Sequence, residues 1–399
     1  RRQRQMCIRD SSILSCNSVN NNLVLKKIAR KIIGSDLLYI NHDLTKEQRR
    51  ILISYVSPLH VDFLKDKVYH SLYYTVNQII SVFIDMGFSI DICDCNDKNA
   101  ITRLEGNYYD YIFGFGKVYL ELVKKNRCKS SILFVTENNP SVVEVKYNER
   151  ISYFKKRHPE ISVRSSIKRI GYFNMEQFEV SDYGIVLSSH YNAKTMASYF
   201  DKMFTINVNG LYNPNYIYKR CHIEQNRMHF LWFGSQGVIH KGLDILIDAF
   251  RTMPDCILNI YGVPQQEMKI VQPLLSSNIF VHKTCNVMSD NFLTEVVGEN
   301  VFVVSASCSE GMMSGIATCM LHGIIPIVTK ETGYESSSCI FEFEDYTVEK
   351  IQEAIREVNS LSLKDIYKLS QECFEYAHRQ FTLEAFRKRF VEIVTELEK

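Results

Sequence analysis

The sequence predicts an α/β protein of two doubly wound parallel-sheet domains with a crevice between them. Short apolar runs rich in β-branched residues alternate with segments whose apolar residues recur at helical spacing, as in parallel strands joined by helices. This alternation occurs twice, on either side of an Asn-rich stretch at residues 207–220 that has the composition of a linker. The chain has 399 residues, which suits two or three domains. Ligands of such sheets bind beyond the C-terminal ends of the strands, so functional residues are expected there.

In the first half, the strand at residues 51–56 is apolar on both faces, as expected in the centre of a parallel sheet. Ser57 and Pro58 end this strand, and apolar residues from Val68 to Phe83 then fall on one helical face. The strands expected in this half cover residues 51–56, 88–94, 109–116, 130–136 and 183–189.

The second half repeats the pattern without repeating the sequence, so the chain is not a repeat array. Its strands are expected at residues 230–235, 256–262, 278–283, 300–306 and 323–329. Its helices are expected at residues 241–251, 315–322, 348–360 and 382–399.

The domain boundaries follow from these elements. We expect residues 1–48 to be a tail, and residues 1–10 to be a sequencing artefact, because MCIRD is the translation of a tag used in transposon-based sequencing libraries. The first domain is expected at residues 49–215 and the second at 216–378. The last segment, 379–399, is expected to be a helix that packs back toward the first domain.

Composition excludes several classes of protein. The net charge of +2 gives no reason to expect nucleic acid as a partner. The 12 cysteines include no CxxC pair, so no zinc site is expected, and neither a signal peptide nor a spanning apolar run of about 18 residues is visible. We therefore expect reduced thiols and a cytoplasmic protein. Residues 141–170 carry a local charge of +5, which indicates either a solvated helix face or contact with an anionic membrane surface or a phosphate-bearing acceptor.

A candidate phosphate site follows the first strand of the second half. The strand ends at Gly234 and Ser235, and a short loop leads to His240 and Lys241 at an expected helix start. Backbone N–H groups at a helix start favour anions, and lysine adds a full charge. The alternative is a helix that merely begins with lysine. A dinucleotide site is not expected, because Tyr119 occupies the third glycine position after Gly114 and Gly116.

A single carboxylate, Glu310, follows the strand at residues 300–306. Carboxylates at such strand ends accept hydrogen bonds from sugar hydroxyls. The backbone N–H groups of Gly311 to Ser314, at the next helix start, are expected to be free to meet a phosphate. A sugar joined to a diphosphate would satisfy both groups. The alternative is a glutamate that only caps the following helix.

These segments together resemble a known family. FLWFGSQGVIHKGLDILIDAF, NIYG and SASCSEGMMSGIATCMLHGIIPIVTKETG resemble the C-terminal domain of GT-B glycosyltransferases, specifically the large retaining group called family 4. The match covers residues 230–333, while the first half resembles the group in architecture only. The resemblance implies the GT-B fold, in which two Rossmann-like domains face each other across a crevice.

The resemblance implies roles for several residues. Lys241 matches the lysine that binds the donor diphosphate, while Ser235 stands where arginine is common. Glu310 matches the first acid of an E-x7-E motif, which contacts the transferred sugar, and Thr318 replaces the second acid, which normally holds the ribose hydroxyls. We therefore expect Lys241 and Glu310 to be catalytic. The expected donor-binding residues are Gly234, Ser235, His240, Gly262, Asn286, Val287, Gly311, Met312, Met313, Ser314 and Thr318.

The implied activity is retaining, metal-independent transfer of a hexose from a nucleotide sugar to a glycan or lipid-linked acceptor, with no cofactor besides the donor. The expected acceptor-side residues are Ser57, His60, His70 and His190. At the level of the family, the product would be a bacterial polysaccharide, and contact with the inner membrane surface is possible. Two alternatives stay open: a sugar phosphorylase or nucleotide-sugar epimerase of the same fold, and a non-catalytic protein that binds a nucleotide sugar or glycan and in which Thr318 marks decay.

Overall fold

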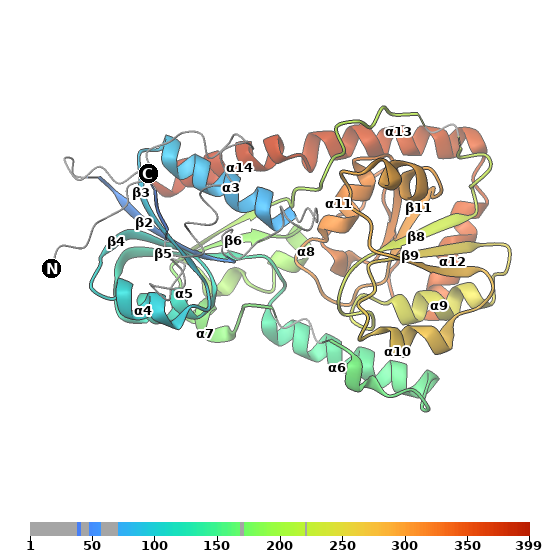
Figure 1. The fold of residues 1–399 in the computed structure, drawn as a ribbon, viewed down its shortest axis with the longest axis horizontal. Helices are drawn as coiled ribbons and strands as arrows, with labels where there is room; N and C mark the ends of the chain where they lie inside the picture. Colours follow the sequence, from blue (N-terminus) through green and yellow to red (C-terminus); the bar gives the residue numbers. More distant parts are fainter. Residues whose placement is uncertain (1–37, 41–47, 57–70, 168–170, 220–221) are drawn as a thin grey trace.

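A computed structural model describes residues 38–40, 48–56, 71–167, 171–219 and 222–399. Two sheets lie side by side along the long axis of the molecule, each with helices on both faces (Figure 1). The expected acceptor-side residues Ser57, His60 and His70 lie outside the described residues.

The first sheet has the strand order β1-β3-β2-β4-β5-β6-β7. Its members are parallel except β1, which pairs with β3 in the antiparallel sense and lies within the segment expected to be a tail. Residues 51–55 of β2 are all buried, because helices cover both faces of the sheet. The strands are β1 (Leu38–Ile40), β2 (Arg50–Tyr55), β3 (Ser89–Asp94), β4 (Tyr109–Gly114), β5 (Cys128–Val135), β6 (Tyr183–Leu187) and β7 (Lys202–Ile206).

The helices of this half connect successive strands. They are α3 (Ser71–Asp85), α4 (Lys98–Leu104), α5 (Gly116–Lys124), α6 (Pro140–Arg157), α7 (Met175–Glu179) and α8 (His190–Ala193), with the 3₁₀ turns Val163–Ser165 and Ala197–Tyr199.

The second sheet is fully parallel, with the order β10-β9-β8-β11-β12-β13. The chain leaves β8 in one direction toward β9 and β10, and then crosses back to β11 on the other side of β8. This reversal is a topological switch point, beyond which doubly wound sheets bind their ligands. The strands are β8 (His229–Phe233), β9 (Ile257–Tyr261), β10 (Ile279–His282), β11 (Phe302–Ser305), β12 (Ile325–Val328) and β13 (Phe341–Glu342).

Helices cover this sheet too, and the last of them, α14, extends beyond it to the first domain. They are α9 (Leu243–Arg251), α10 (Met268–Val271), α11 (Ser314–Met320), α12 (Val348–Asn359), α13 (Leu363–Gln380) and α14 (Leu383–Leu397), with the π turn Phe292–Val297 and the 3₁₀ turns Gln272–Leu274 and Lys330–Thr332.

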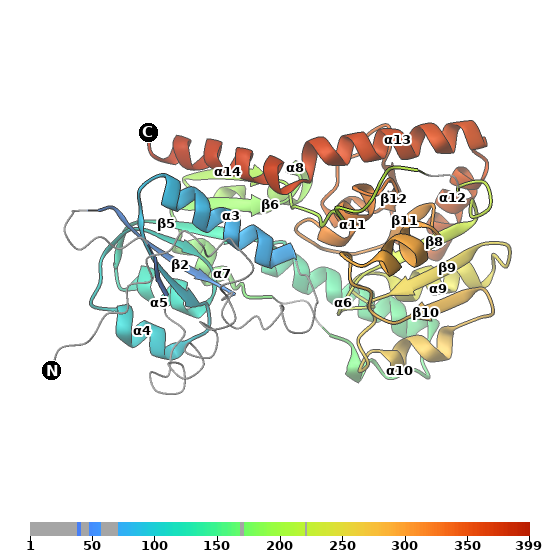
Figure 2. The same ribbon diagram turned by 45° about the horizontal axis from the view of Figure 1, so that its top comes forward.

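Helices α13 and α14 form a strap across both halves. Figures 1 and 2 show α13 along the second half and α14 continuing beside α3 of the first. The ring of Phe390 in α14 lies 5.7 Å from that of Phe83 in α3 and 5.8 Å from that of Phe113 in β4. The last helix therefore completes the core of the first domain.

Helix α6 makes a second connection, because it reaches from the first domain to α9 of the second (Figure 1). Arg150 donates to Asp244 at 2.8 Å and to the carbonyl of Ile239 at 3.0 Å. Arg157 pairs with Asp244 and Asp248. These two arginines belong to the basic segment at residues 141–170, and neither lies on a solvated helix face: both are engaged in ion pairs between the domains.

Candidate functional site

The predicted catalytic residues lie together at the switch point of the second sheet. Lys241 Nζ lies 2.5 Å from Glu310 Oε1, and both residues are buried. Ser307 Oγ donates to the same carboxylate oxygen at 3.0 Å. Lys241 comes from the loop after β8 and Glu310 from the loop after β11, the two strands at which the chain reverses. Both residues therefore lie beyond the C-terminal ends of parallel strands, next to the point at which the chain reverses.

The loop that carries Lys241 is a tight turn, and α9 begins only at Leu243. Lys241 N–H donates to the carbonyl of Gly237 at 2.7 Å. Gly242 follows with a φ of +72°, and a Cβ there would lie 2.2 Å from the carbonyl oxygen of Ala306. Lys241 therefore precedes the helix instead of starting it, which corrects the expected helix at residues 241–251.

A buried carboxylate fixes the first part of this loop. Glu267, fully buried, accepts from the N–H of Gly237 at 2.7 Å and from that of Val238 at 3.2 Å. Its other contact is the N–H of Ile167, from the segment that follows α6, at 3.0 Å. Glu267 thus holds the lysine loop and the first domain in one arrangement.

His240 is fixed in one tautomer by its neighbours. Its Nε2 contacts the carbonyl oxygen of Ser309, which can only accept, so Nε2 carries the hydrogen. Nδ1 then accepts from the thiol of Cys308 at 3.8 Å. Burial raises the pKa of that thiol to about 12, so it stays protonated and able to donate. His240 therefore ties the lysine loop to the loop that carries Glu310.

The loop after Glu310 is anchored to β12 and the turn that follows. Glu310 N–H donates to the carbonyl of Glu331 at 2.9 Å, and Met313 N–H donates to the carbonyl of Thr332 at 3.1 Å. The expectation that the N–H groups of Gly311 to Ser314 are free is therefore wrong at Met313. Ser314 is the first residue of α11.

Residues of the first domain contact this loop directly. Asn192 Nδ2 donates to the carbonyl of Glu310 at 2.9 Å, and Ser188 Oγ donates to that of Gly311 at 3.3 Å. A Cβ at Gly311 would lie 2.7 Å from the carbonyl oxygen of Thr136 and 2.8 Å from that of Leu187. The two domains are therefore closed on each other at the Glu310 loop.

Thr318 is buried and its hydroxyl is engaged on both sides. It accepts from the N–H of Leu211 in the linker at 3.0 Å and donates to the carbonyl of Ser314 at 2.9 Å. A Cβ at Gly210 would lie 2.8 Å from Thr318 N, so the linker runs directly over this turn of α11. The hydroxyl of Thr318 therefore holds the linker against α11.

The remaining donor-side residues lie around the same sheet edge. Gly234 and Gly262 adjoin, because a Cβ at Gly262 would lie 2.1 Å from the carbonyl oxygen of Gly234, and Ser235 beside them is exposed. Asn286 and Val287 follow β10, where the carbonyl of Val287 accepts from Asn213 Nδ2 in the linker at 2.9 Å.

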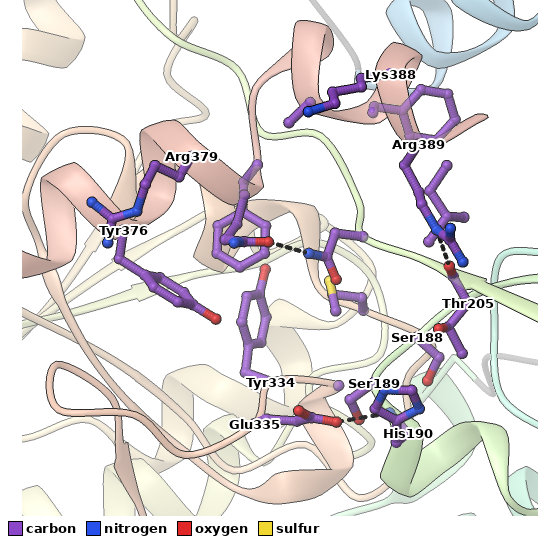
Figure 3. A pocket seen from close by; sticks show the side chains of 18 of the residues that line it. Ser188, Ser189, His190, Thr205, Tyr334, Glu335, Tyr376, Arg379, Lys388 and Arg389 are labelled. Carbon is purple, nitrogen blue, oxygen red and sulfur yellow. Dashed lines mark hydrogen bonds between the residues drawn. The ribbon is translucent and has the colours of Figure 1, made fainter. Parts of the chain in front are cut away.

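Of the other predicted residues, Met312 and Met313 pack around the Glu310 loop, whereas His190 is exposed. The sulfur of Met312 lies 3.3 Å from the N–H of Val208, and that of Met313 lies 3.2 Å from Ser305 Oγ, so both fill space around the loop. His190 is exposed at the start of α8 and lines a pocket between the domains (Figure 3).

Two residues that sequence reasoning missed as site members are Asn192 and Glu331. Asn192 follows β6 at its C-terminal end, so its position after a strand was the available signal. Glu331 accepts from Tyr191 Oη at 3.5 Å, and burial raises the pKa of its carboxyl group. Its side chain lies between Tyr191 of the first domain and the backbone that anchors Glu310.

Two general features of the described residues bear on the site. No helix within them has the length and apolar character needed to cross a membrane. They also contain no group of three or more His, Cys, Asp or Glu side chains that could hold a metal ion.

The sequence matches no family model and no curated protein. Several solved structures are similar. Sucrose-phosphate synthase from Thermosynechococcus elongatus has a TM-score of 0.61 at 13% identity, over 88% of this chain and 99% of that chain. Anabaena HepE in complex with UDP and glucose has 0.58 at 10% identity, over 88% and 100%. WaaG, a glycosyltransferase involved in lipopolysaccharide biosynthesis, has 0.54 at 12% identity, over 87% and 99%. The likeness is one of fold, and it confirms the predicted GT-B arrangement of two Rossmann-like domains.

Proposed function

We propose that this protein is a glycosyltransferase that moves a sugar from a nucleoside diphosphate to a hydroxyl group of a glycan or lipid-linked acceptor. The observation that carries the proposal is the Lys241–Glu310 pair at the switch point of the second sheet. A lysine suited to a diphosphate and a carboxylate suited to sugar hydroxyls adjoin there, as a sugar joined to a diphosphate requires. The GT-B fold supports the proposal, and HepE of that fold has been solved with UDP-glucose.

The donor would rearrange the pair. Lys241 is neutralised by Glu310 in this structure, at 2.5 Å. An entering diphosphate would take the lysine as its own partner, because charge-assisted hydrogen bonds to phosphate are strong. Glu310 would then accept from the transferred sugar, still held by Ser307. His240, which contacts the carbonyl of Ser309, would hold the Lys241 loop and the Glu310 loop at a fixed distance during this exchange.

The reaction we propose retains the configuration of the sugar. The bond between the anomeric carbon and the diphosphate oxygen breaks, and the acceptor oxygen bonds to the same face of that carbon. The proton of the acceptor hydroxyl passes to the leaving diphosphate. Lys241 stabilises the charge that develops on the leaving group, which is the main catalytic contribution of such a site, and no metal is required.

Recognition of the ribose would differ from the family pattern. Thr318 already satisfies Leu211 and Ser314, so its hydroxyl is not offered to a ligand. We propose that the ribose is held by other groups at the ends of β9 and β10. A lipid-linked acceptor would bring a cytoplasmic protein to the inner membrane surface, and Lys155 and Lys156 are exposed at the end of α6.

The proposal is tested first by thermal unfolding with UDP, GDP and ADP, and then by sugar transfer. A ligand at about 100 times its dissociation constant adds about 2.7 kcal/mol of stability, so one nucleotide should raise the midpoint by several degrees. Lys241→Ala should abolish that rise and transfer, while Lys364→Ala, which removes an exposed lysine of α13, should change neither. Absence of a rise with every nucleotide would overturn the proposal and favour the non-catalytic alternative.

A further inference from the structure

Three backbone N–H groups converge on one buried carboxylate beneath the loop that carries Lys241. Glu267 is fully buried, and its Oε2 accepts from the N–H of Gly237 at 2.7 Å. Its Oε1 accepts from the N–H of Val238 at 3.2 Å and from that of Ile167 at 3.0 Å. A carboxylate can only accept hydrogen bonds when ionised, so it suits a place where several donors and no acceptor are present.

The two loop residues that Glu267 holds are also the two that hold Lys241 and the start of α9. The carbonyl of Gly237 accepts from the N–H of Lys241 at 2.7 Å. The carbonyl of Val238 accepts from the N–H of Leu243, the first residue of α9, at 2.9 Å. The backbone of Lys241 is therefore connected to Glu267 through a single residue, with a hydrogen bond on each side of it.

The third N–H group on this carboxylate comes from the other half of the chain. Ile167 lies between two strands of the first sheet, yet the segment before it packs with the second domain. Phe154 is fully buried in the core of that domain, and Val163 packs against the same core. The turn Val163–Ser165 contacts α10, which begins directly after Glu267. A segment of the first domain therefore ends on the carboxylate that supports the lysine loop.

From these contacts we infer that Glu267 is a positioning residue for Lys241, and that the segment after α6 contributes to donor affinity through Glu267. The inference rests on the proposed function and adds to it a residue that acts only through the lysine loop. Lys241 has to exchange Glu310 for a diphosphate, so its backbone must stay fixed while its side chain moves. A reacting group displaced by about 1 Å loses much of its effect.

The first test replaces the carboxylate by an amide of the same size. Glu267→Gln exchanges one acceptor oxygen for an NH₂ group, which would then face a backbone N–H. We expect UDP to bind this variant about tenfold or more weakly than the wild type, in calorimetric titration well below the unfolding midpoint. Glu299→Gln, which changes an exposed carboxylate of the same domain, should bind UDP as the wild type does.

Uridine separates positioning of Lys241 from a general effect on the fold. This nucleoside lacks the diphosphate, so it makes no contact that depends on Lys241. Uridine should therefore bind Glu267→Gln and the wild type equally, while UDP loses about tenfold in affinity. A variant that only destabilised the fold would change the two affinities alike. If thermal unfolding identifies GDP or ADP as the ligand, guanosine or adenosine replaces uridine in this comparison.

A second variant tests the contribution of the first domain. Ile167→Pro removes the N–H that Glu267 accepts from the segment after α6 and leaves its bonds to Gly237 and Val238 in place. Ser166 already has the extended backbone that a residue before proline requires, with φ of −65° and ψ of 131°. The affinity for UDP should fall by about threefold, with uridine again unaffected.

Amide hydrogen exchange provides a readout that needs no ligand. In Glu267→Gln, the amides of residues 237–241 should exchange about tenfold faster than in the wild type, because the bond that holds the loop is lost. If the wild type binds no nucleotide at all, that result counts against the transferase alone, and this exchange rate still tests the support of the loop.

Three results would overturn the positioning role: unchanged UDP affinity in Glu267→Gln, equal losses for UDP and uridine, or unchanged exchange at residues 237–241. Full UDP affinity in Ile167→Pro would overturn the contribution of the first domain.

Discussion

Arg150 of α6 donates to Asp244 of α9 at 2.8 Å, and the side chains of both residues are almost fully buried between the domains. Asp244 also pairs with Arg157, whereas Arg150 has no second carboxylate among its described partners. The pair adjoins the loop that carries Lys241, because Arg150 also donates to the carbonyl of Ile239. The charge that fixes the lysine loop therefore comes from the other domain.

The two members of this pair should differ in their cost of removal. Asp244→Leu leaves Arg150 buried without a carboxylate and takes one of two carboxylates from Arg157, so it should lower the free energy of unfolding by about 3–5 kcal/mol. Arg150→Met should cost less, because Arg157 still pairs with Asp244. The comparison is made by thermal and urea unfolding. Lys368→Met, which breaks an exposed pair with Glu372, is the control and should cost less than about 1 kcal/mol. Equal costs for the two buried variants would contradict the asymmetry.

Thr318→Val should destabilise the junction between the linker and α11. The variant keeps the shape of the side chain but leaves the N–H of Leu211 buried without a partner, at a cost of about 1–3 kcal/mol in unfolding free energy. Thr318→Ser keeps the hydroxyl and serves as the control for that bond. If valine proves as stable as serine in chemical unfolding, the bond to Leu211 contributes nothing.

Gly311→Ala should impair closure of the domains more than it impairs folding. The new Cβ would press on the carbonyl oxygens of Thr136 and Leu187 in the first domain. We expect a larger radius of gyration in small-angle scattering and a rate of the proposed transfer reduced by about tenfold or more, since displacing a loop that positions reacting groups by about 1 Å has large effects. Gly106→Ala, where a Cβ meets nothing within 4 Å, should leave both values unchanged. An unchanged radius in Gly311→Ala would mean that the loop adjusts without opening.

Stability should carry a pH dependence that originates at Glu331. Burial raises the pKa of this carboxyl above its ordinary value of 4.5 in the folded protein, so the folded state binds the proton more tightly than the unfolded state does. Stability therefore falls as the pH rises from 4.5 through the raised pKa. Glu331→Gln removes this component of the pH dependence. The unfolding midpoint of the variant minus that of the wild type should therefore increase as the pH rises over that range. A difference between the two proteins that stays constant with pH would refute the assignment.

The strands that lie in the centre of each sheet were predictable, because burial on both faces requires continuous apolar runs such as residues 51–55 and 302–305. The edge strand β7 was missed, since its sequence KMFTI alternates and only Phe204 and Ile206 are buried. Helix α6 carries no continuous apolar face, and its buried groups include an arginine, so its role between the domains left no periodic signal.

In the candidate site too, some features could be predicted from the sequence and others could not. Local sequence predicted a strand end before each of Lys241 and Glu310, and the pairing of β8 with β11 brings the two residues together. The bond from Leu211 to Thr318 joins residues 107 positions apart, and the contact of Asn192 with Glu310 joins residues 118 apart. Such contacts depend on how the domains meet, which no local pattern encodes.

The position of Phe390 has a consequence for how the chain is made. Its ring packs against Phe83 and Phe113, which belong to a domain whose sheet is complete by residue 206. During synthesis, that sheet would leave the ribosome long before α14 does, and an apolar face of α3 would stay uncovered until α14 emerges. Domains generally fold as units from the N-terminus during translation. Here the core of the first domain is complete only once α14 is made. A nascent or prematurely ended chain therefore exposes aromatic side chains, which chaperones can bind and which favour aggregation.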